Sequence, residues 1–179
     1  LDLVSSWGGP ALEEVGRLYE CGDTFLPQLL SSAQAAGGVC RLAEELLARQ
    51  GVKQEPKGTV VLATVEGDLH DLGKNVVGMV LASHGYRVVD LGKDVPAERI
   101  LEAAEAERAD VVGLSALMTS TVPQMEAVIR GARERGAAYR IIVGGAAVSP
   151  QYAESIGADG TSSDAVGAAR LVEQLLARR

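Results

Sequence analysis

Residues 59–75 read TVVLATVEGDLHDLGKN, and they join a short apolar run to a polar loop and then to a helical pattern. The run at 59–65 is rich in β-branched residues, as expected of a strand that is buried on both faces of a sheet. The helical pattern at 74–84 ends before Gly85, a common helix terminator. A strand that leads through a loop into a helix begins a βαβ unit, so this stretch predicts an α/β fold.

The same alternation continues to the end of the chain. Further strands are predicted at 86–92, 110–116, 139–145 and 159–163, and further helices at 97–108, 122–135, 150–156 and 165–178. Five strands joined by right-handed helical crossovers form a parallel, Rossmann- or flavodoxin-like sheet with helices on both faces. We expect the strand order 2-1-3-4-5, which places a ligand crevice between the first and third strands, at their carboxyl ends.

The chain before this pattern carries helical signals only. Residues 1–50 are interpreted as a small all-α cap domain, residues 51–58 (GVKQEPKG) as a linker, and residues 59–179 as the α/β domain. Because the chain begins with Leu1 rather than Met, we interpret it as a fragment of something longer; whether it belongs to a multidomain enzyme or is a separate subunit stays open.

Composition excludes several classes of partner. The formal net charge is −7 and no basic stripe is present, which argues against binding to a nucleic-acid backbone. No run of 18 apolar residues and no charged leader occurs, so no membrane partner is expected and a cytoplasmic location is predicted. Cys21 and Cys40 form no CxxC pair, which favours free thiols in a reducing compartment.

His70 is one of only two histidines, and it lies where the predicted fold expects a ligand. The simplest interpretation is a loop histidine satisfied by Asp68 or Asp71. A phosphate loop of the GxxxxGK[ST] type is rejected, because five residues separate Gly67 from Gly73 and the residue after the lysine is not a hydroxyl residue.

A metal site made only of protein ligands lacks the necessary side chains. Zinc and non-haem iron need at least three ligands, and the second histidine, His84, is explained by its place at a helix end. One imidazole suffices where a macrocycle already holds the metal. Asp68 would then accept a hydrogen bond from the other ring nitrogen of His70, and Gly73 would let the loop turn beside a large planar ligand.

Asp68-x-His70-x-x-Gly73 resembles the DxHxxG signature of cobalamin-binding domains. GDLHDLGKN in particular is similar to the corrinoid domain of cobalamin-dependent methionine synthase and to the corrinoid proteins of methanol and methylamine methyltransferases. Three further matches follow in the same order as in that family: FLPQLL at 25–30, the SxL segment at 115–117 with its following hydroxyls, and the GGA turn at 144–146. The family's cap is a four-helix bundle, and 50 residues leave room for three helices, so the first part of the cap is expected to be missing.

The resemblance implies a role for each matching residue. His70 displaces the cofactor's own dimethylbenzimidazole and becomes the axial ligand of cobalt, and Asp68 and Thr121 form a proton relay. The cofactor contacts that the resemblance implies are Gly67, Asp68, Leu69, His70, Asp71, Leu72, Gly73, Ser115, Leu117, Thr119, Thr121, Gly144, Gly145, Ala146 and Ser163, with the rest of TSS at 161–163 near the nucleotide tail. The residues implied to cover the upper face of the corrin are Tyr19, Phe25, Leu26 and Leu29.

The function that this resemblance implies is a methyl carrier of one-carbon metabolism that is not catalytic alone. It would hold methylcobalamin, cob(I)alamin or a related corrinoid base-off and His-on, and shuttle a methyl group between the donor and acceptor sites of a methyltransferase such as methionine synthase. The implied partners are methyl-donor and methyl-acceptor domains or subunits and a reductive reactivation partner. Two alternatives stay open, a cobalamin-dependent sensor and the cobalamin subunit of a mutase. A phosphoacceptor receiver domain is disfavoured, because the third predicted strand ends in Ser115 rather than Asp.

Overall fold

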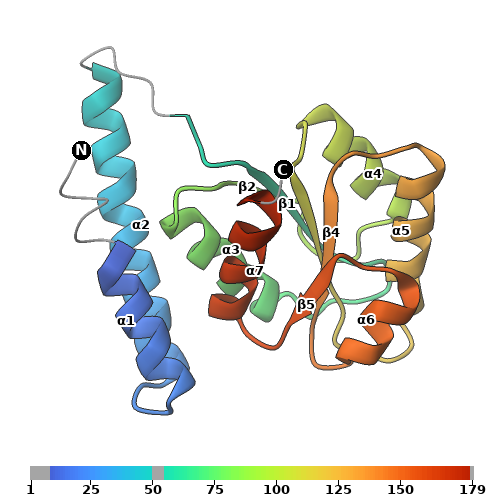
Figure 1. The fold of residues 1–179 in the computed structure, drawn as a ribbon, viewed down its shortest axis with the longest axis horizontal. Coiled ribbons are helices and arrows are strands. Elements are labelled where there is room, and N and C mark those ends of the chain that lie inside the picture. The colour runs from blue at the N-terminus through green and yellow to red at the C-terminus, as the bar shows by residue number, and fades with distance from the viewer. Residues whose placement is uncertain (1–8, 50–54, 178–179) are drawn as a thin grey trace.

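The computed structural model describes residues 9–49 and 55–177 (Figure 1). Its centre is a parallel sheet of five strands in the order β2-β1-β3-β4-β5, which confirms the predicted fold and strand order. The strands, each within two residues of its predicted bounds, are β1 (Thr59–Thr64), β2 (Arg87–Asp90), β3 (Val111–Ser115), β4 (Arg140–Gly144) and β5 (Gly160–Ser162). The helices that connect and follow them are α3 (Leu72–Ser83), α4 (Ala97–Ala106), α5 (Pro123–Glu134), α6 (Pro150–Ile156) and α7 (Ala165–Ala177).

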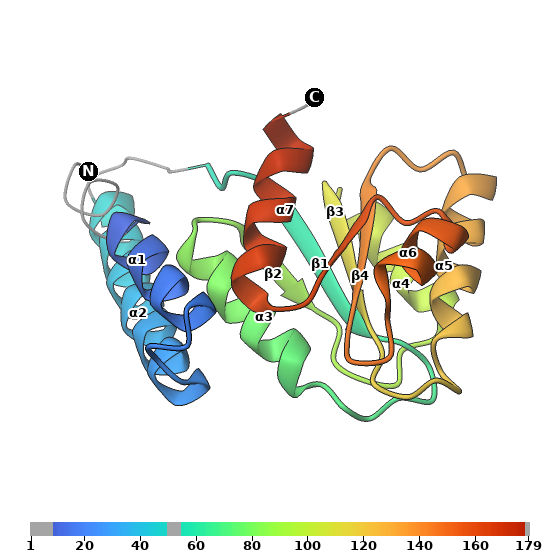
Figure 2. The same ribbon diagram turned by 60° about the horizontal axis from the view of Figure 1, so that its bottom comes forward.

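Alternate residues of the strands pack into two separate apolar clusters, one on each face of the sheet. Val60 and Leu62 of β1 lie in the cluster formed with α3 and α7, whereas Val61 and Ala63 lie in the cluster formed with α4, α5 and α6. Figure 2 shows the two helical layers on either side of the strands. Burial on both faces explains why the sequences of the central strands β1 and β3 are mainly apolar rather than alternating.

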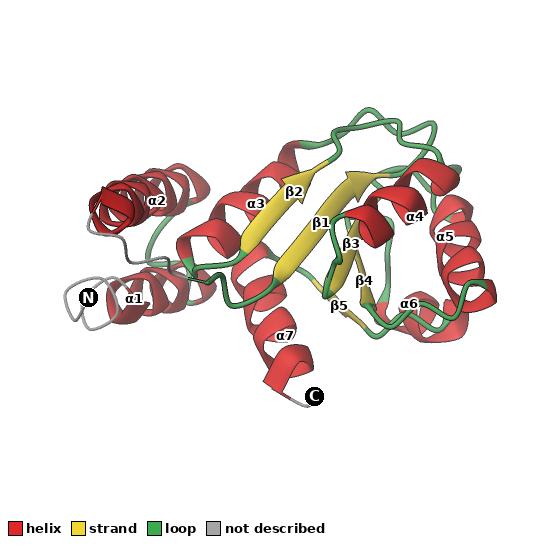
Figure 3. Cartoon of the chain, turned by 90° about the horizontal axis from the view of Figure 1, so that it is seen from above, coloured by secondary structure: helices red, strands yellow, loops and turns green. Residues whose placement is uncertain are grey.

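Residues 9–49 form two helices, α1 (Gly9–Glu20) and α2 (Leu26–Arg49), which lie beside α3 and α7 rather than beside the other layer (Figure 3). Leu29 and Ala33 of α2 are each 2% exposed, which shows that this helix packs closely. α1 approaches α7 at Gly16, where an added Cβ would lie 2.8 Å from a methyl carbon of Val166. The sequence leaves room for three cap helices, but residues 9–49 form two. The reason is that α2 continues unbroken through its pair of glycines for 24 residues.

The carboxyl ends of the strands carry the loops that build the site. The loop after β1 holds His70, the loop after β3 holds residues 116–122, and the loop after β2 runs beside the first of these. Within the described ranges, no helix combines the length and the apolar character needed to span a lipid bilayer.

Candidate functional site

The loop between β1 and α3 turns sharply, so that Asp68 points inward and His70 outward. Gly67 has φ +81°, a left-handed conformation that suits glycine, and the amide of Asp68 donates to the carbonyl of Val65 over 3.1 Å. After this turn the Asp68 side chain is fully buried, whereas the imidazole of His70 is 53% exposed. One turn therefore places a buried carboxylate directly behind an accessible imidazole.

Five hydrogen-bond donors converge on the carboxylate of Asp68. Its Oδ1 accepts from the backbone amide of His70 over 3.0 Å and faces the ring Nδ1 over 2.9 Å. Its Oδ2 accepts from the amides of Leu117 over 2.7 Å and Met118 over 3.1 Å. The hydroxyl of Thr121 also donates to Oδ2, over 2.8 Å. The loop after β3 thus holds one carboxylate oxygen while the other oxygen holds His70.

These donors keep Asp68 ionised despite its burial. Burial is the largest single influence and raises the pKa of the Asp68 carboxyl. The amide of His70, the hydroxyl of Thr121, the His70 ring and the amide of Leu117 together lower that pKa by more, so it lies well below its usual range. An ionised carboxylate only accepts hydrogen bonds, so Nδ1 of His70 must carry the ring proton. In the neutral imidazole the other ring nitrogen, Nε2, then has a free lone pair.

A cavity of about 1330 Å³ opens beside this imidazole. The sheet face supplies Leu62, Gly113 and Ile142 to its wall, α3 and α7 supply its sides, and the loop with His70 borders it. Its volume exceeds the range of about 300–1,000 Å³ that is usual for drug-sized ligands. Three leucines of the cavity wall, Leu69, Leu72 and Leu117, are exposed, so the cavity offers apolar surface next to the free nitrogen. The site suits a large, partly apolar ligand that needs one nitrogen donor.

Most of the predicted cofactor contacts lie together on the wall of this cavity: Leu69, His70, Asp71, Leu72, Gly73, Ser115, Leu117, Gly144, Gly145, Ala146 and Ser163. Thr161 and Ser162 lie there too. Asp68 and Thr121 are buried and do not line the cavity, Gly67 forms the turn, and Thr119 is exposed outside the cavity wall. The cavity extends from β1 across to β5, beyond the crevice between the first and third strands that the sequence predicts, because its sides are α3 and α7.

The cap residues divide into two groups. Tyr19 and Leu29 line the cavity, as an upper cover would require. Phe25 does not; its side chain is 69% exposed at the beginning of α2. The side chain of Leu26 lies outside the described part of the structure.

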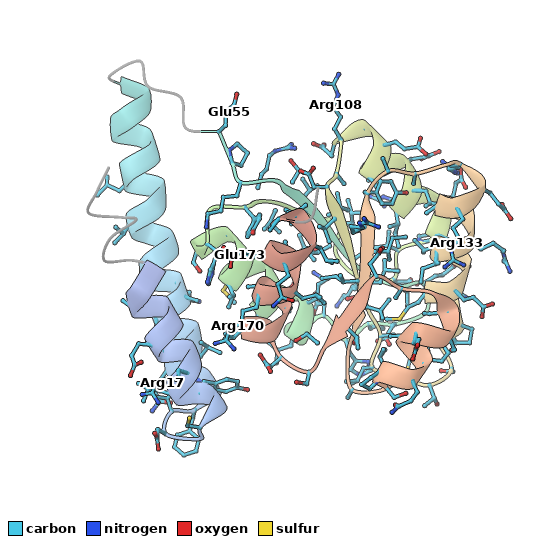
Figure 4. The ribbon with its side chains drawn as sticks, in the orientation of Figure 1. Arg17, Glu55, Arg108, Arg133, Arg170 and Glu173 are labelled. Carbon is cyan, nitrogen blue, oxygen red and sulfur yellow. The ribbon has the colours of Figure 1, made fainter. Side chains whose placement is uncertain are left out.

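Sequence reasoning missed the contribution of α7 and of Lys74. Arg170, Leu171 and Gln174 of α7 line the cavity, and Figure 4 shows Arg170 extending from α7 toward the cap helices. Only the packing of α7 against α3 reveals which of its faces borders the cavity. The Lys74 side chain is 2% exposed and its Nζ lies 2.5 Å and 2.6 Å from the two carboxylate oxygens of Asp90. This ion pair joins the first turn of α3 to the end of β2.

The donor set fits a metal that is already held by a macrocycle. Across residues 9–49 and 55–177, no group of three or more His, Cys, Asp or Glu side chains is placed to hold a metal ion. His84 makes a contact of 2.8 Å between its Nδ1 and the carbonyl of Val80 and is not part of the cavity wall. His70 therefore offers a single ring nitrogen beside a large cavity, which is what a metal already held by a macrocycle requires.

Comparison with known proteins identifies the relatives of this chain. A family description of the B12 binding domain matches residues 58–170. The chain is 37% identical over 181 residues to a corrinoid protein of Desulfitobacterium hafniense strain Y51, covering 99% of this chain and 84% of that protein. It is 38% identical over 178 residues to dimethylamine corrinoid protein 1 of Methanosarcina acetivorans, covering 98% and 83%.

Solved structures agree with these relatives. A chain of the methanol:cobalamin methyltransferase complex MtaBC from Methanosarcina barkeri aligns with a TM-score of 0.85 and 34% identity, covering 100% of this chain and 68% of that one. A cobalamin-binding protein from Desulfitobacterium hafniense DCB-2 aligns with a TM-score of 0.82 and 26% identity, covering 97% and 82%. The receiver domain of NarL from Mycobacterium tuberculosis, at a TM-score of 0.55 and 23% identity over 70% of this chain and 100% of that one, shares the fold alone.

Proposed function

Because this chain belongs to the B12-binding domain family and its cofactor is cobalamin or a related corrinoid, we propose that it is the methyl-carrying corrinoid protein of a methyltransferase system. When bound, the cofactor supplies a cobalt centre that accepts a methyl group and gives it up again. Nε2 of His70 would hold the cobalt in place of the cofactor's own base, the base-off and His-on arrangement.

One observation carries the proposal: the hydrogen bond of 2.9 Å between Nδ1 of His70 and the buried carboxylate of Asp68. A carboxylate on the far nitrogen of a metal-binding histidine fixes its tautomer, fixes the orientation of the ring and raises the basicity of the ligating nitrogen. Since Nδ1 donates to Asp68, only Nε2 is available as a ligand, and the exposure of the ring leaves it accessible.

The contacts that a proton relay needs are present. His70 contacts Asp68, and the Thr121 hydroxyl lies 2.8 Å from Oδ2 of the same carboxylate and 2.9 Å from the carbonyl of Met118, so its one proton is shared between these two acceptors. Thr121 is 6% exposed. The hydroxyl therefore supports the charge on Asp68, and the relay itself stays a prediction.

The names of the relatives favour small methylated compounds, rather than the methyl donor of methionine synthase, as the source of the methyl group. The relatives named above include dimethylamine corrinoid protein 1 and a chain of the methanol:cobalamin methyltransferase complex. We therefore propose a methyl-donor methyltransferase subunit as the first partner, with a methyl-acceptor methyltransferase and a reductive reactivation partner as the others.

We also propose residues 1–50 as a separate cap domain, joined by 51–58 to the cobalamin-binding domain of 59–179. The cytoplasmic location stays a prediction.

The visible absorption spectrum tests the axial ligand. The protein is incubated with methylcobalamin, desalted and compared with His70→Ala. We expect retained cofactor whose spectrum shows histidine coordination in the wild type, and loss of that coordination in the variant. His84→Ala is the matched control, because it removes the second histidine, which lies away from the cavity.

The two variants separate the possible outcomes. Wild-type protein that retains no cofactor, or a His70→Ala spectrum equal to that of His84→Ala, would contradict the proposal. Transfer of the bound methyl group to a thiol in the presence of a corrinoid-dependent methyltransferase then distinguishes a carrier from a sensor or a mutase subunit, because only a carrier exchanges the group with a second nucleophile.

A further inference from the structure

The segment that follows β2 runs along the His70 loop and is bonded to it through the backbone. The amide of Thr64 donates to the carbonyl of Gly92 over 3.0 Å, and the amide of Val95 donates to the carbonyl of Thr64 over 3.1 Å. Val65 and Val95 also form a parallel bridge beyond the ends of the strands. The loop that carries the candidate axial ligand therefore has a second loop fixed along its side.

Asp94 contacts the His70 loop in two ways. Its side-chain Oδ1 accepts from the amide of Gly67 over 2.7 Å. Its own backbone amide donates to the carbonyl of Asp68 over 3.0 Å. Asp94 thus contacts the turn residue before Asp68 through its side chain, and Asp68 itself through its backbone.

The backbone of Asp94 is in an uncommon conformation. Its φ is +55°, in the left-handed region that most residues with a side chain avoid and that Asp and Asn tolerate best. Such conformations persist where the surrounding contacts hold them, and they gather at functional sites. In this conformation the amide and the carboxylate of Asp94 both contact the neighbouring loop.

We propose that Asp94 is a positioning residue, which sets the Gly67–Asp68 turn and thereby the orientation of His70. Asp94 is not part of the cavity wall, so it acts through the loop rather than on the ligand. The side chain of Asp68 is held by the loop after β3 and its backbone carbonyl by Asp94, so the two contacts fix the residue from opposite sides. This inference rests on the proposed role of His70 as the axial ligand.

Three variants separate the backbone conformation of Asp94 from its side chain. Asp94→Asn keeps a carbonyl oxygen that accepts from Gly67 and also tolerates the left-handed conformation. Asp94→Gly keeps the conformation but removes the acceptor. Arg108→Gly is the matched control, because Arg108 also has a positive φ, +51°. Arg108 lies just before β3, at the amino ends of the strands, whereas the His70 loop lies at their carboxyl ends (Figure 4).

Two readouts are needed. The first is the hydrogen-exchange rate of the Gly67 amide in the cofactor-free protein, measured by NMR, with urea unfolding as a check on global stability. Loss of a hydrogen bond to a carboxylate predicts exchange about tenfold faster in Asp94→Gly, and a rate within about twofold of wild type in Asp94→Asn. The second is the equilibrium constant for histidine coordination of bound methylcobalamin. We expect this constant to fall about tenfold in Asp94→Gly and to be restored in Asp94→Asn.

The outcomes distinguish this inference from the proposed function. A wild-type spectrum without histidine coordination contradicts the proposed function, whatever the exchange rates. If wild type is His-coordinated, the positioning role is supported by faster Gly67 exchange together with reduced coordination in Asp94→Gly. It is overturned if Gly67 exchange is unchanged, if coordination is unchanged, or if Arg108→Gly lowers coordination equally.

Discussion

Replacement of Asp68 by asparagine tests the geometry of the site most directly, because it removes the charge and keeps the shape. The carboxylate accepts from five donors, three at Oδ2 and two at Oδ1. An asparagine side chain accepts at its oxygen only, and its NH₂ group must face the donors on the other side. We expect the oxygen to face Leu117, Met118 and Thr121, since more donors lie there, and the NH₂ group to face His70.

The consequences for His70 can be estimated from these contacts. The imidazole can adapt by moving its proton to Nε2, so that Nδ1 accepts from the new NH₂ group. The backbone amide of His70 cannot adapt and is left unpaired. One lost charged hydrogen bond and one unpaired amide together predict a loss of about 2–4 kcal/mol in the free energy of unfolding. Because the ligating nitrogen would then carry the proton, we expect histidine coordination to weaken by about tenfold to a hundredfold.

Urea unfolding and the absorption spectrum of bound methylcobalamin measure the two effects, and ¹⁵N NMR of the cofactor-free protein reports the tautomer of His70. Asp159→Asn is a suitable control. Asp159 is a carboxylate whose Oδ2 accepts from the amide of Ile141 over 2.7 Å, away from the cavity wall. It should lose stability without any change in the spectrum. Wild-type coordination and an unchanged tautomer in Asp68→Asn would refute the reasoning.

Three further predictions concern stability and are checked by urea unfolding. The folded pKa of Asp68 lies below its unfolded value of about 3.9. The contribution of ionised Asp68 to the free energy of unfolding is therefore complete above about pH 4 and is lost as the pH falls through the folded pKa. The difference in the free energy of unfolding between wild type and Asp68→Asn should narrow on acidification. Gly145→Ala should cost about 3 kcal/mol or more, since φ is +115° and the added Cβ would lie 2.1 Å from a backbone oxygen, whereas Gly73→Ala, with open space around it, should cost nothing or stabilise slightly. Lys74→Met should change stability by less than about 1 kcal/mol because the Asp90 side chain is 42% exposed and can be hydrated, but Asp90→Ala should cost about 3 kcal/mol because it leaves a buried ammonium without its counter-charge, although the Oδ1 of Asn75 still accepts from it.

β1, β3 and β4 were predictable because each is a compact, mainly apolar run between polar segments. The prediction extended even to β5, which has three residues and was expected at 159–163. Helix ends were less certain. α3 begins at Leu72 rather than at residue 74, and Asp71 before it makes no side-chain hydrogen bond to the helix. Without a capping bond, the sequence around residues 71–73 carries little signal for where the helix begins.

The candidate site was predictable where one loop carries it and less so where distant elements meet. His70, Asp68 and Gly73 share a single motif, so their relation is local. Arg170 and Asp94 have no such local signal. Arg170 borders the cavity because α7 packs beside α3, and Asp94 contacts Gly67 because the loop after β2 is bonded alongside. Contacts of this kind depend on tertiary packing, which single-sequence patterns do not encode.

The strand order explains why the ligand loop lies where it does. β1 lies between β2 and β3, and the loops after both neighbours hold the loop after β1. The loop after β3 binds the carboxylate of Asp68, and the loop after β2 binds its backbone carbonyl and the turn at Gly67. The cavity, in contrast, is bordered by α3 and α7 and by the strand residues on the sheet face that they cover, Leu62, Gly113 and Ile142. The residues that hold Asp68 are therefore largely distinct from those that enclose the cavity, although His70 itself belongs to the cavity wall. Substitutions at Asp68 or Asp94, which do not line the cavity, should change histidine coordination while leaving the space for the cofactor intact.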